Sequence, residues 1–328
     1  MKRRRVSSVD QPVEDAPDYE VPEHAKPLQL PGTIKNKQRR VALFAKLKRE
    51  REKLRKKFRK AQEEQAQATG QPVPVARPQR TLDNTRTPDP TMVREADEEV
   101  FADEDVDEFA AYFARAAAPK VLMTTSERPS AGLRAVVREM LRVFPNSERV
   151  PRRRHALKDM VRWAAGRGYT DLLVWEETAW RTKKGVDSLV LVHLPDGPTA
   201  HFRISSLVLP KQIKNHGRPS AHFPELVLNR FDTRLGRTVG RMFAALFPQD
   251  PQFLGRRVVT LHNQRDFLFF RHHRYVFESR EKVRLQEMGP RFTLRLQTLQ
   301  HGTFDTRFGE YEFVKKPELQ PDRKTFAL

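Results

Sequence analysis

Ser188–Leu209 reads SLVLVHLPDGPTAHFRISSLVL and carries the clearest structural pattern in the chain. Its two apolar runs, 188–193 and 200–209, are separated by Pro195-Asp196-Gly197-Pro198, and such a cluster of Pro, Asp and Gly is typical of a turn. The pattern predicts two strands that follow one another through a short connection. The apolar run 171–175, upstream of this pair, is typical of a buried strand.

Helical patterns lie on both sides of these strands. Apolar residues recur at helical spacing over 132–144, and a second helix fits 157–166. The same spacing over 235–247 ends before Pro248, which cannot continue a helix. Further strands are predicted at 120–125, 226–228, 256–261, 267–270, 274–277, 283–288 and 292–297. The order of strand, helix and strands therefore occurs twice, which predicts an α/β (α+β) fold of two similar halves, each a sheet with packed helices.

Composition limits the classes of function. The chain has 328 residues and a net charge of +20, from 62 Lys and Arg against 42 Asp and Glu, and only 38% of its residues are hydrophobic. This apolar fraction is low for one compact globule of that length, so the polar excess is expected in segments outside the core. A chain this basic is expected to bind a polyanion, and nucleic acid is the first candidate.

Several kinds of site are not indicated. The chain has no cysteine, which excludes disulfides and thiolate metal sites, and no apolar run approaches the roughly 20 residues that span a bilayer. Phosphate-binding glycine motifs are absent, and the histidines lack metal-ligand spacing. We expect no enzyme, no cofactor, no metal, no membrane and no small-molecule substrate. The basic cluster 2–5 is either a nuclear import signal or an accident of a basic protein.

The polar excess is concentrated at the start of the chain. We predict a disordered tail at 1–34, a basic helix at 35–67, a Pro-rich and then acidic linker at 68–117, a folded domain at 118–305 and a C-terminal tail at 306–328. The acidic part, 95–108, is interleaved with apolar and aromatic residues. It is either a solvated spacer, a docking peptide for a basic protein surface, or a segment that folds back on the basic helix.

The predicted basic helix has 14 Lys and Arg against two acids between Lys35 and Lys60. Its apolar stripe is too narrow to bury the helix in a core. It is either a solvated helix against one partner surface or a helix laid along RNA, and the second reading is favoured because so much like charge repels itself without an anion. The candidate RNA contacts are Lys35, Lys37, Arg39, Arg40, Lys46, Lys48, Arg49, Arg55, Lys56 and Lys57.

Arginines alternate with aromatic residues in the second half of the folded domain. Arginine binds phosphate with a planar fork of donors, and aromatic rings can stack on unpaired bases. Alternation also places many of these rings in the core, so the arginines are the better candidates. They are Arg265, Arg271, Arg274, Arg284, Arg291 and Arg295.

Three stretches, 194–202, 259–271 and 284–294, resemble in the same order the motifs of the Brix domain family. The resemblance implies a domain of two halves, about 118–223 and 224–305, each similar to the anticodon-binding domain of class II aminoacyl-tRNA synthetases. It also implies RNA contact through the last motif. Those residues are Gly289, Pro290, Arg291, Phe292, Thr293 and Arg295.

The resemblance further implies a function. It is that of a non-catalytic assembly factor, in the nucleus and nucleolus, that binds precursor ribosomal RNA of the large subunit and is needed for its folding and processing. The implied protein partners are a dedicated smaller assembly factor and ribosomal proteins of the pre-ribosome. The alternative is a protein–protein scaffold in a nuclear particle with only non-specific affinity for RNA.

Overall fold

The computed structural model describes residues 36–69, 81–82, 84–87, 89–93, 97–178, 185–304, 309–316 and 325–328. Contacts divide the chain into two compact units, 1–79 and 80–328. The predicted tail 1–34, the basic cluster 2–5 and Lys35 lie outside the described residues. No described helix is long and apolar enough to cross a membrane.

The first unit contains helix α1 (Lys37–Thr69), close to the helix predicted at 35–67. Asn36 caps its first turn, because the side-chain Oδ1 accepts hydrogen bonds from the backbone N–H groups of Gln38 and Arg39 at 3.0 and 3.2 Å. The 33 residues of the helix span roughly 50 Å at 1.5 Å per residue. The side chains of Leu43, Leu47 and Arg51 are half-buried, and the other side chains described between 36 and 61 are exposed.

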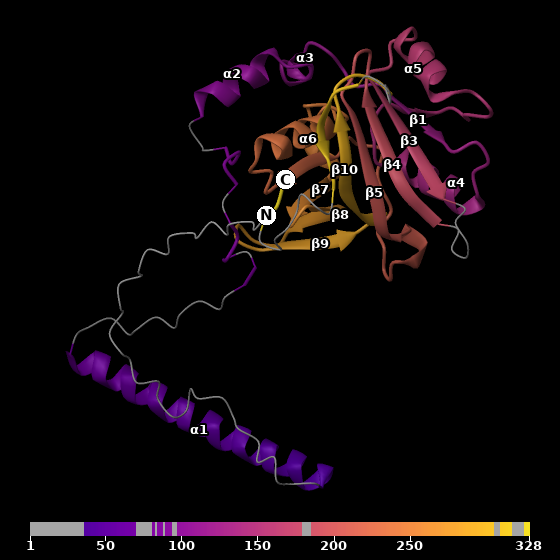
Figure 1. Cartoon of the computed structure of the whole chain (residues 1–328). Helices are drawn as coiled ribbons and strands as arrows, with labels where there is room; N and C mark the ends of the chain where they lie inside the picture. The colour runs from indigo at the N-terminus through magenta and orange to yellow at the C-terminus, as the bar shows by residue number, and fades with distance from the viewer. Residues whose placement is uncertain are drawn as a thin grey trace, which may run out of the picture. The chain divides into compact units, whose positions relative to one another are not determined.

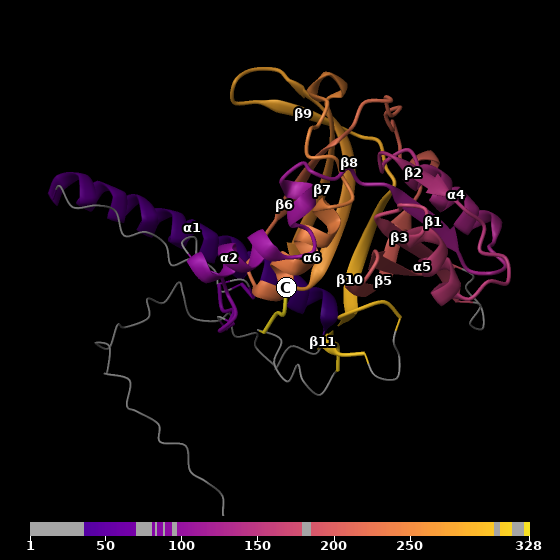
Figure 2. The same cartoon turned by 90° about the horizontal axis from the view of Figure 1, so that it is seen from above.

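The second unit is built on one sheet, which Figures 1 and 2 show as continuous across both halves. Among the described residues it has 11 strands in the order β2-β1-β3-β4-β5-β10-β8-β7-β6, with β11 on β10 and β9 on β8. The strands are β1 (Val121–Thr125), β2 (Ser147–Arg149), β3 (Asp171–Thr178), β4 (Gly185–His193), β5 (Thr199–Val208), β6 (Glu225–Asn229), β7 (Arg257–Gln264), β8 (Phe267–Phe277), β9 (Val283–Glu287), β10 (Arg291–Gln300) and β11 (Tyr311–Val314). The helices are α2 (Glu98–Val106), α3 (Ala110–Phe113), α4 (Ala131–Met140), α5 (Leu157–Ala165) and α6 (Arg234–Ala244), with 3₁₀ turns at Pro210–Gln212 and Phe253–Gly255.

Most predicted elements are present, with some corrections. The strands predicted at 267–270 and 274–277 are one long strand, β8. The helix predicted at 132–144 ends at Met140. Strands β2 and β11 were not predicted, because β2 is only three residues long and β11 has no clear alternation.

The two halves repeat one topology. In the first half β1 pairs with β3 in parallel, and β4 and β5 follow antiparallel. In the second half β6 pairs with β7 in parallel, and β8 and β10 follow antiparallel. The last strands of the halves then pair with each other, so that Leu294 of β10 lies opposite Ile204 of β5. This antiparallel pairing makes one sheet from two.

Helices α4 and α6 cover the same face of the sheet and share one core with it. Leu133 and Val137 of α4 and Val239 and Phe243 of α6 are fully buried in that core. Helix α5 covers the opposite face of the first half only, where Met160 and its neighbours pack on β1, β3 and β4. Amphipathic spacing explains each helix, since its apolar stripe faces the sheet.

The second half has no described counterpart of α5. After α6 the chain passes through the 3₁₀ turn Phe253–Gly255 and enters β7 directly. The outer face of β7, β8, β10 and β5 is therefore left without a helix among the described residues. We call this surface the open face.

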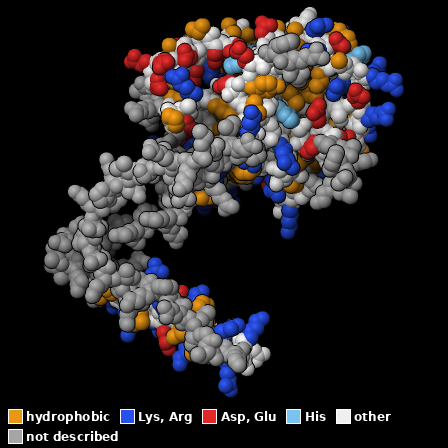
Figure 3. All heavy atoms as spheres, in the orientation of Figure 1, with side chains coloured by type: hydrophobic (Ala, Val, Ile, Leu, Met, Phe, Trp, Pro, Cys, Tyr) orange, Lys and Arg blue, Asp and Glu red, His pale blue; other side chains and the backbone are white. Residues whose placement is uncertain are grey.

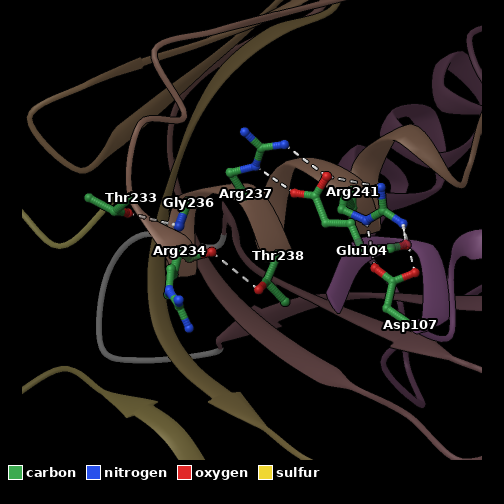
Figure 4. Close-up of polar contacts among 8 residues, drawn as sticks. All are labelled: Glu104, Asp107, Thr233, Arg234, Gly236, Arg237, Thr238 and Arg241. Carbon is green, nitrogen blue, oxygen red and sulfur yellow. Dashed lines mark hydrogen bonds and ion pairs between the residues drawn. The ribbon is translucent and has the colours of Figure 1, made fainter. Parts of the chain in front are cut away.

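The acidic segment is part of the folded unit, which corrects its prediction as a linker. Phe109 and Tyr112 are buried in the core shared with α4 and α6. Glu104 binds Arg237 through two hydrogen bonds, and Asp107 binds Arg241 at 2.5 and 2.7 Å (Figure 4). We call residues 97–114 the acidic strap. Figure 3 shows its Asp and Glu side chains gathered over α2.

Part of the predicted C-terminal tail also packs on the domain. Leu328 is buried in the main core. The Asp266 carboxylate accepts the backbone N–H groups of Ala327 and Leu328 at 2.8 and 2.9 Å. Burial raises the pKa of Asp266, although these two hydrogen bonds oppose the shift.

A buried guanidinium joins the two halves. Arg257 of β7 donates to the carbonyl oxygens of Arg142, Ser220 and His222 at 2.6 to 2.8 Å. Its Nε donates to Nε2 of His272 at 3.3 Å, so the imidazole must donate from Nδ1, which lies 2.8 Å from the carbonyl oxygen of Gly289. Burial lowers the pKa of Arg257 to about 10 and that of His272 to about 4.

The neutral state of His272 predicts a pH dependence of stability. The folded chain excludes a proton that the unfolded chain binds at the ordinary pKa of 6.5, so His272 costs stability as the pH falls from 6.5 towards about 4. The full loss is about 3 kcal/mol. His272→Asn can still donate to the Gly289 carbonyl but cannot titrate, and we expect a flatter pH profile in urea unfolding. An unchanged profile would contradict a neutral, buried His272.

Removing an anchor of the acidic strap should destabilise the whole unit. Phe109 is 1% exposed, and Phe109→Ala is expected to cost about 3–5 kcal/mol in the free energy of unfolding because it leaves a cavity in the core. Val106→Ala is the matched control on the same strap, since Val106 is 86% exposed. A loss below about 1 kcal/mol for Phe109→Ala would show that the strap is not part of the cooperative unit.

Candidate nucleic-acid interface

The open face is built by strand alternation. In β8 the side chains of Leu268, Phe270 and His272 point into the core and are buried, whereas Phe267, Phe269, Arg271 and His273 are half-buried on the other side. The neighbouring strands continue this surface. It includes Thr260 and His262 of β7, Arg291 and Arg295 of β10, and Arg203 and Ser205 of β5.

Arginines lie over aromatic rings on this face. The guanidinium carbon of Arg295 is 4.8 Å from the ring centroid of Phe267, and that of Arg271 is 5.6 Å from the centroid of Phe269. Cation–π contacts of this kind position each guanidinium group over a ring of the open face, and arginine is also a good ligand for phosphate.

Three cations gather at one end of the open face. The register places Arg295 of β10 directly opposite Arg203 of β5. Like charges in this position destabilise a sheet. The pKa of Lys315, just after β11, is lowered by burial and by the charges of Arg295 and Arg203, while Asp266 opposes the shift. A bound anion would relieve this repulsion. We call Arg203, Arg295 and Lys315 the cation cluster.

A second group of charges lies further along the face. Arg291 forms an ion pair with Glu287 at 3.0 Å. Arg271 donates to the carbonyl oxygens of Phe270 and Phe292 at 2.8 and 3.3 Å. Its pKa is lowered by burial and by Arg291, and Glu287 opposes the shift. This end of the face therefore carries more nearly balanced charge than the cation cluster.

Four residues of the last Brix-like motif are structural rather than exposed. Phe292 is 1% exposed and stacks on Phe270 with ring centroids 4.4 Å apart. Gly289, Pro290 and Thr293 are also buried. Gly289 has a φ of 66°, and a Cβ there would lie 2.7 Å from Cδ1 of Ile213. The predicted side-chain contact of Gly289, Pro290 and Phe292 with RNA is therefore corrected, because the motif forms the loop into β10. Thr293 lies on the open face with Arg291 and Arg295, opposite Ser205 and Phe269, but is only 6% exposed.

The other predicted arginines of the second half are dispersed. Arg274 is half-buried and lies opposite Arg257, which by alternation places it on the other side of the sheet from the open face. Arg284 is exposed on the β8–β9 hairpin, which projects in Figure 2, and forms an ion pair with Glu278 at 2.5 Å. Arg265 lies in the turn between β7 and β8 with a φ of 57°.

Helix α1 carries nine of the predicted RNA contacts. Within the first unit they are all exposed, and they extend around and along the helix rather than on one stripe. They are Lys37, Arg39, Arg40, Lys46, Lys48, Arg49, Arg55, Lys56 and Lys57. Lys35 is outside the described residues.

Arg203 and Lys315 were missed by the sequence reasoning. Arg203 lies in a predicted strand, and alternation alone would place it on the face opposite Phe202 and Ile204. Its pairing with Arg295 joins residues about 90 positions apart, for which the sequence holds no local signal. Among the described residues no group of three His, Asp or Glu side chains is arranged to hold a metal ion.

Several known proteins are similar to this chain. Ribosome production factor 1 from Mus musculus is 48% identical over 297 residues, which cover 90% of this chain and 84% of that protein. Ribosome production factor 1 from Saccharomyces cerevisiae is 40% identical over 305 residues, which cover 90% of this chain and 97% of that protein. A crystal structure titled "probable ribosomal biogenesis protein" from Aeropyrum pernix K1 matches 54% of this chain and 96% of its own with a TM-score of 0.41 and 18% identity.

The family model described as the Brix domain matches residues 126–298, which run from the end of β1 to β10 and include both halves of the sheet. The match covers more than half of the chain, and the motifs at 194–202, 259–271 and 284–294 lie within it. The chain therefore belongs to the Brix domain family.

Proposed function

We propose that this protein is a non-catalytic assembly factor of the large ribosomal subunit precursor that binds ribosomal RNA through the open face and helix α1. The observation that carries the proposal is the cation cluster, in which Arg203 and Arg295 lie opposite each other on a sheet face that no described helix covers. Full-length relatives named ribosome production factor 1 support the assembly role. They also support the proposed location in the nucleus and nucleolus, where ribosomal RNA is processed.

The open face and helix α1 would bind RNA in different ways. The cation cluster and the arginine-covered rings of β8 offer a fixed surface for structured RNA, chiefly through phosphate contacts. Helix α1 adds a second, linear set of cations on the same chain. Linking two weak sites raises the effective concentration of each, so neither needs high affinity alone. Holding two RNA segments in this way would favour correct folding and processing of the precursor.

The proposed protein partners are a dedicated smaller assembly factor and ribosomal proteins. The protein–protein scaffold remains the alternative function. The acidic strap does not favour it, because Glu104 and Asp107 are occupied by arginines of α6 in the same chain. We retain 118–223 and 224–305 as the proposed bounds of the two halves.

The contribution of α1 can be measured by salt dependence. Replacing Lys46, Lys48, Arg49 and Lys56 with Gln removes four cations and keeps good helix formers. The slope of log K against log salt for a large-subunit ribosomal RNA fragment should fall by roughly 3, since each lost phosphate contact removes about 0.7–0.9. Ala42→Gln with Ala45→Gln is the control, which adds the same side chain without removing charge. An unchanged slope would remove α1 from the RNA-binding model.

The open face has its own test. Arg203→Gln with Arg295→Gln should lower affinity for the same RNA at least tenfold, because a hydrogen bond to a charged group contributes about 1.5–3 kcal/mol. Arg134→Gln with Arg138→Gln on α4 is the matched pair, since both of those arginines are exposed away from the open face. Thermal unfolding of each variant checks the fold. Equal affinity for the two double variants would favour the scaffold.

A further inference from the structure

A cavity lies on the first half, where α5 and the end of β2 meet the sheet. It has a volume of about 400 Å³, within the range of small-ligand sites. Its floor is apolar and buried, formed by Leu122, Met160 and Ala164. This cavity belongs to neither the open face nor α1.

Aromatic rings form the walls of the cavity. Trp163 of α5 is 46% exposed, in contrast to Trp175, which is 0% exposed in the core. His155 meets Trp163 edge to face with ring centroids 4.8 Å apart. Tyr169 also lines the cavity, and its hydroxyl donates a hydrogen bond to Glu148. Three planar side chains thus surround a space with an apolar floor.

The rim is strongly cationic. Arg153 and Arg167 line the cavity, and Nζ of Lys120 lies 4.2 Å from the ring centroid of Tyr169. Between Glu148 and Tyr169 the chain has seven Arg and Lys against two acids. Of these acids, Glu148 is bound by Tyr169, and Asp159 lies 4.0 Å from Arg162. The surroundings therefore attract an anion to an aromatic slot.

We propose that this cavity binds one unpaired base of single-stranded RNA, stacked against Trp163, with its phosphates held by Arg153 and Arg167. Stacking on Trp, Tyr or His together with arginine contacts to the backbone is how proteins hold unpaired nucleotides. A paired base cannot enter, because its faces are already stacked in the helix. The proposal rests on the proposed function for the class of ligand, which is RNA. The residues that line the cavity are separate from those of the open face.

The combination of a planar ring and a negative charge distinguishes a nucleotide from an acidic peptide as the occupant. An acidic peptide would satisfy the arginines but would bring carboxylates rather than a flat ring to the apolar floor. A nucleotide supplies both a planar π-system for the walls and a phosphate for the rim. The observed arrangement of rings inside and guanidinium groups outside therefore matches a nucleotide more closely.

Trp163 fluorescence in the full-length protein tests the proposal. The chain has three tryptophans, Trp163, Trp175 and Trp180. With Trp180→Phe, the two that remain are the exposed Trp163, which serves as the reporter, and the buried Trp175. A short single-stranded oligoadenylate, about six nucleotides long, should quench this fluorescence. An abasic chain of the same length, which has the phosphates without the bases, should not.

Affinity provides the second readout. Trp163→Ala should weaken binding of the oligoadenylate about tenfold, the order expected for one stacked base. Trp163→Phe should retain most of the affinity while losing the signal, which guards against a folding defect in the alanine variant. The fluorescence change should persist in Arg203→Gln with Arg295→Gln, so failure of the open face and failure of this slot can be told apart.

Three outcomes would overturn the proposal. The first is fluorescence that does not respond to the oligoadenylate, and the second is equal quenching by the abasic chain. The third is a charge-matched acidic peptide that quenches Trp163 more strongly than the oligoadenylate, which would assign the slot to a protein.

Discussion

The pairing of β5 with β10 is the constraint on which the rest of the domain depends. It joins two βαβ-like halves edge to edge, with Leu294 opposite Ile204 and Arg295 opposite Arg203. One consequence is a core shared by α4 and α6 on the same face. Another is that the last strand of each half is paired. Exposed strand edges promote unwanted association, and this pairing removes two of them. A third is the meeting of two arginines that lie far apart in the sequence.

The asymmetry between the halves determines which face of the sheet is left open. The first half is covered on both faces, by α4 and α5, whereas among the described helices only α6 covers the second half. The residues that would face a counterpart of α5 are arginines and half-buried phenylalanines rather than aliphatic side chains. The second half thus exposes the open face because it lacks a described counterpart of α5, and no additional element is needed to form this surface.

Local patterns predicted most of the elements but little of their assembly. Apolar periodicity identified α4, α5, α6 and the long strands because each pattern lies within a dozen residues. It could not identify the β5–β10 register, which joins distant segments. The acidic strap is predicted as a linker because its charges are typical of solvated chain. The burial of Phe109 and Tyr112 in the core and the ion pairs with Arg237 and Arg241 show otherwise. Phe292 is predicted as an RNA contact from the resemblance alone. Its alternation with Thr293, and its place on the same face as Leu294, fit the core position that the structure shows.

Under the proposed function, the acidic strap also affects how long the chain stays on RNA that lacks its specific site. A chain of net charge +20 with every arginine uncovered would remain for long periods on any polyanion. Glu104 and Asp107 pair with Arg237 and Arg241 within the folded unit, so these two cations are less available to an external polyanion. If the chain binds RNA as proposed, each such neutralised charge would shorten the dwell time of a non-specific encounter. The ion pairs that hold the strap to α6 would therefore also reduce non-specific binding of the folded unit to polyanions.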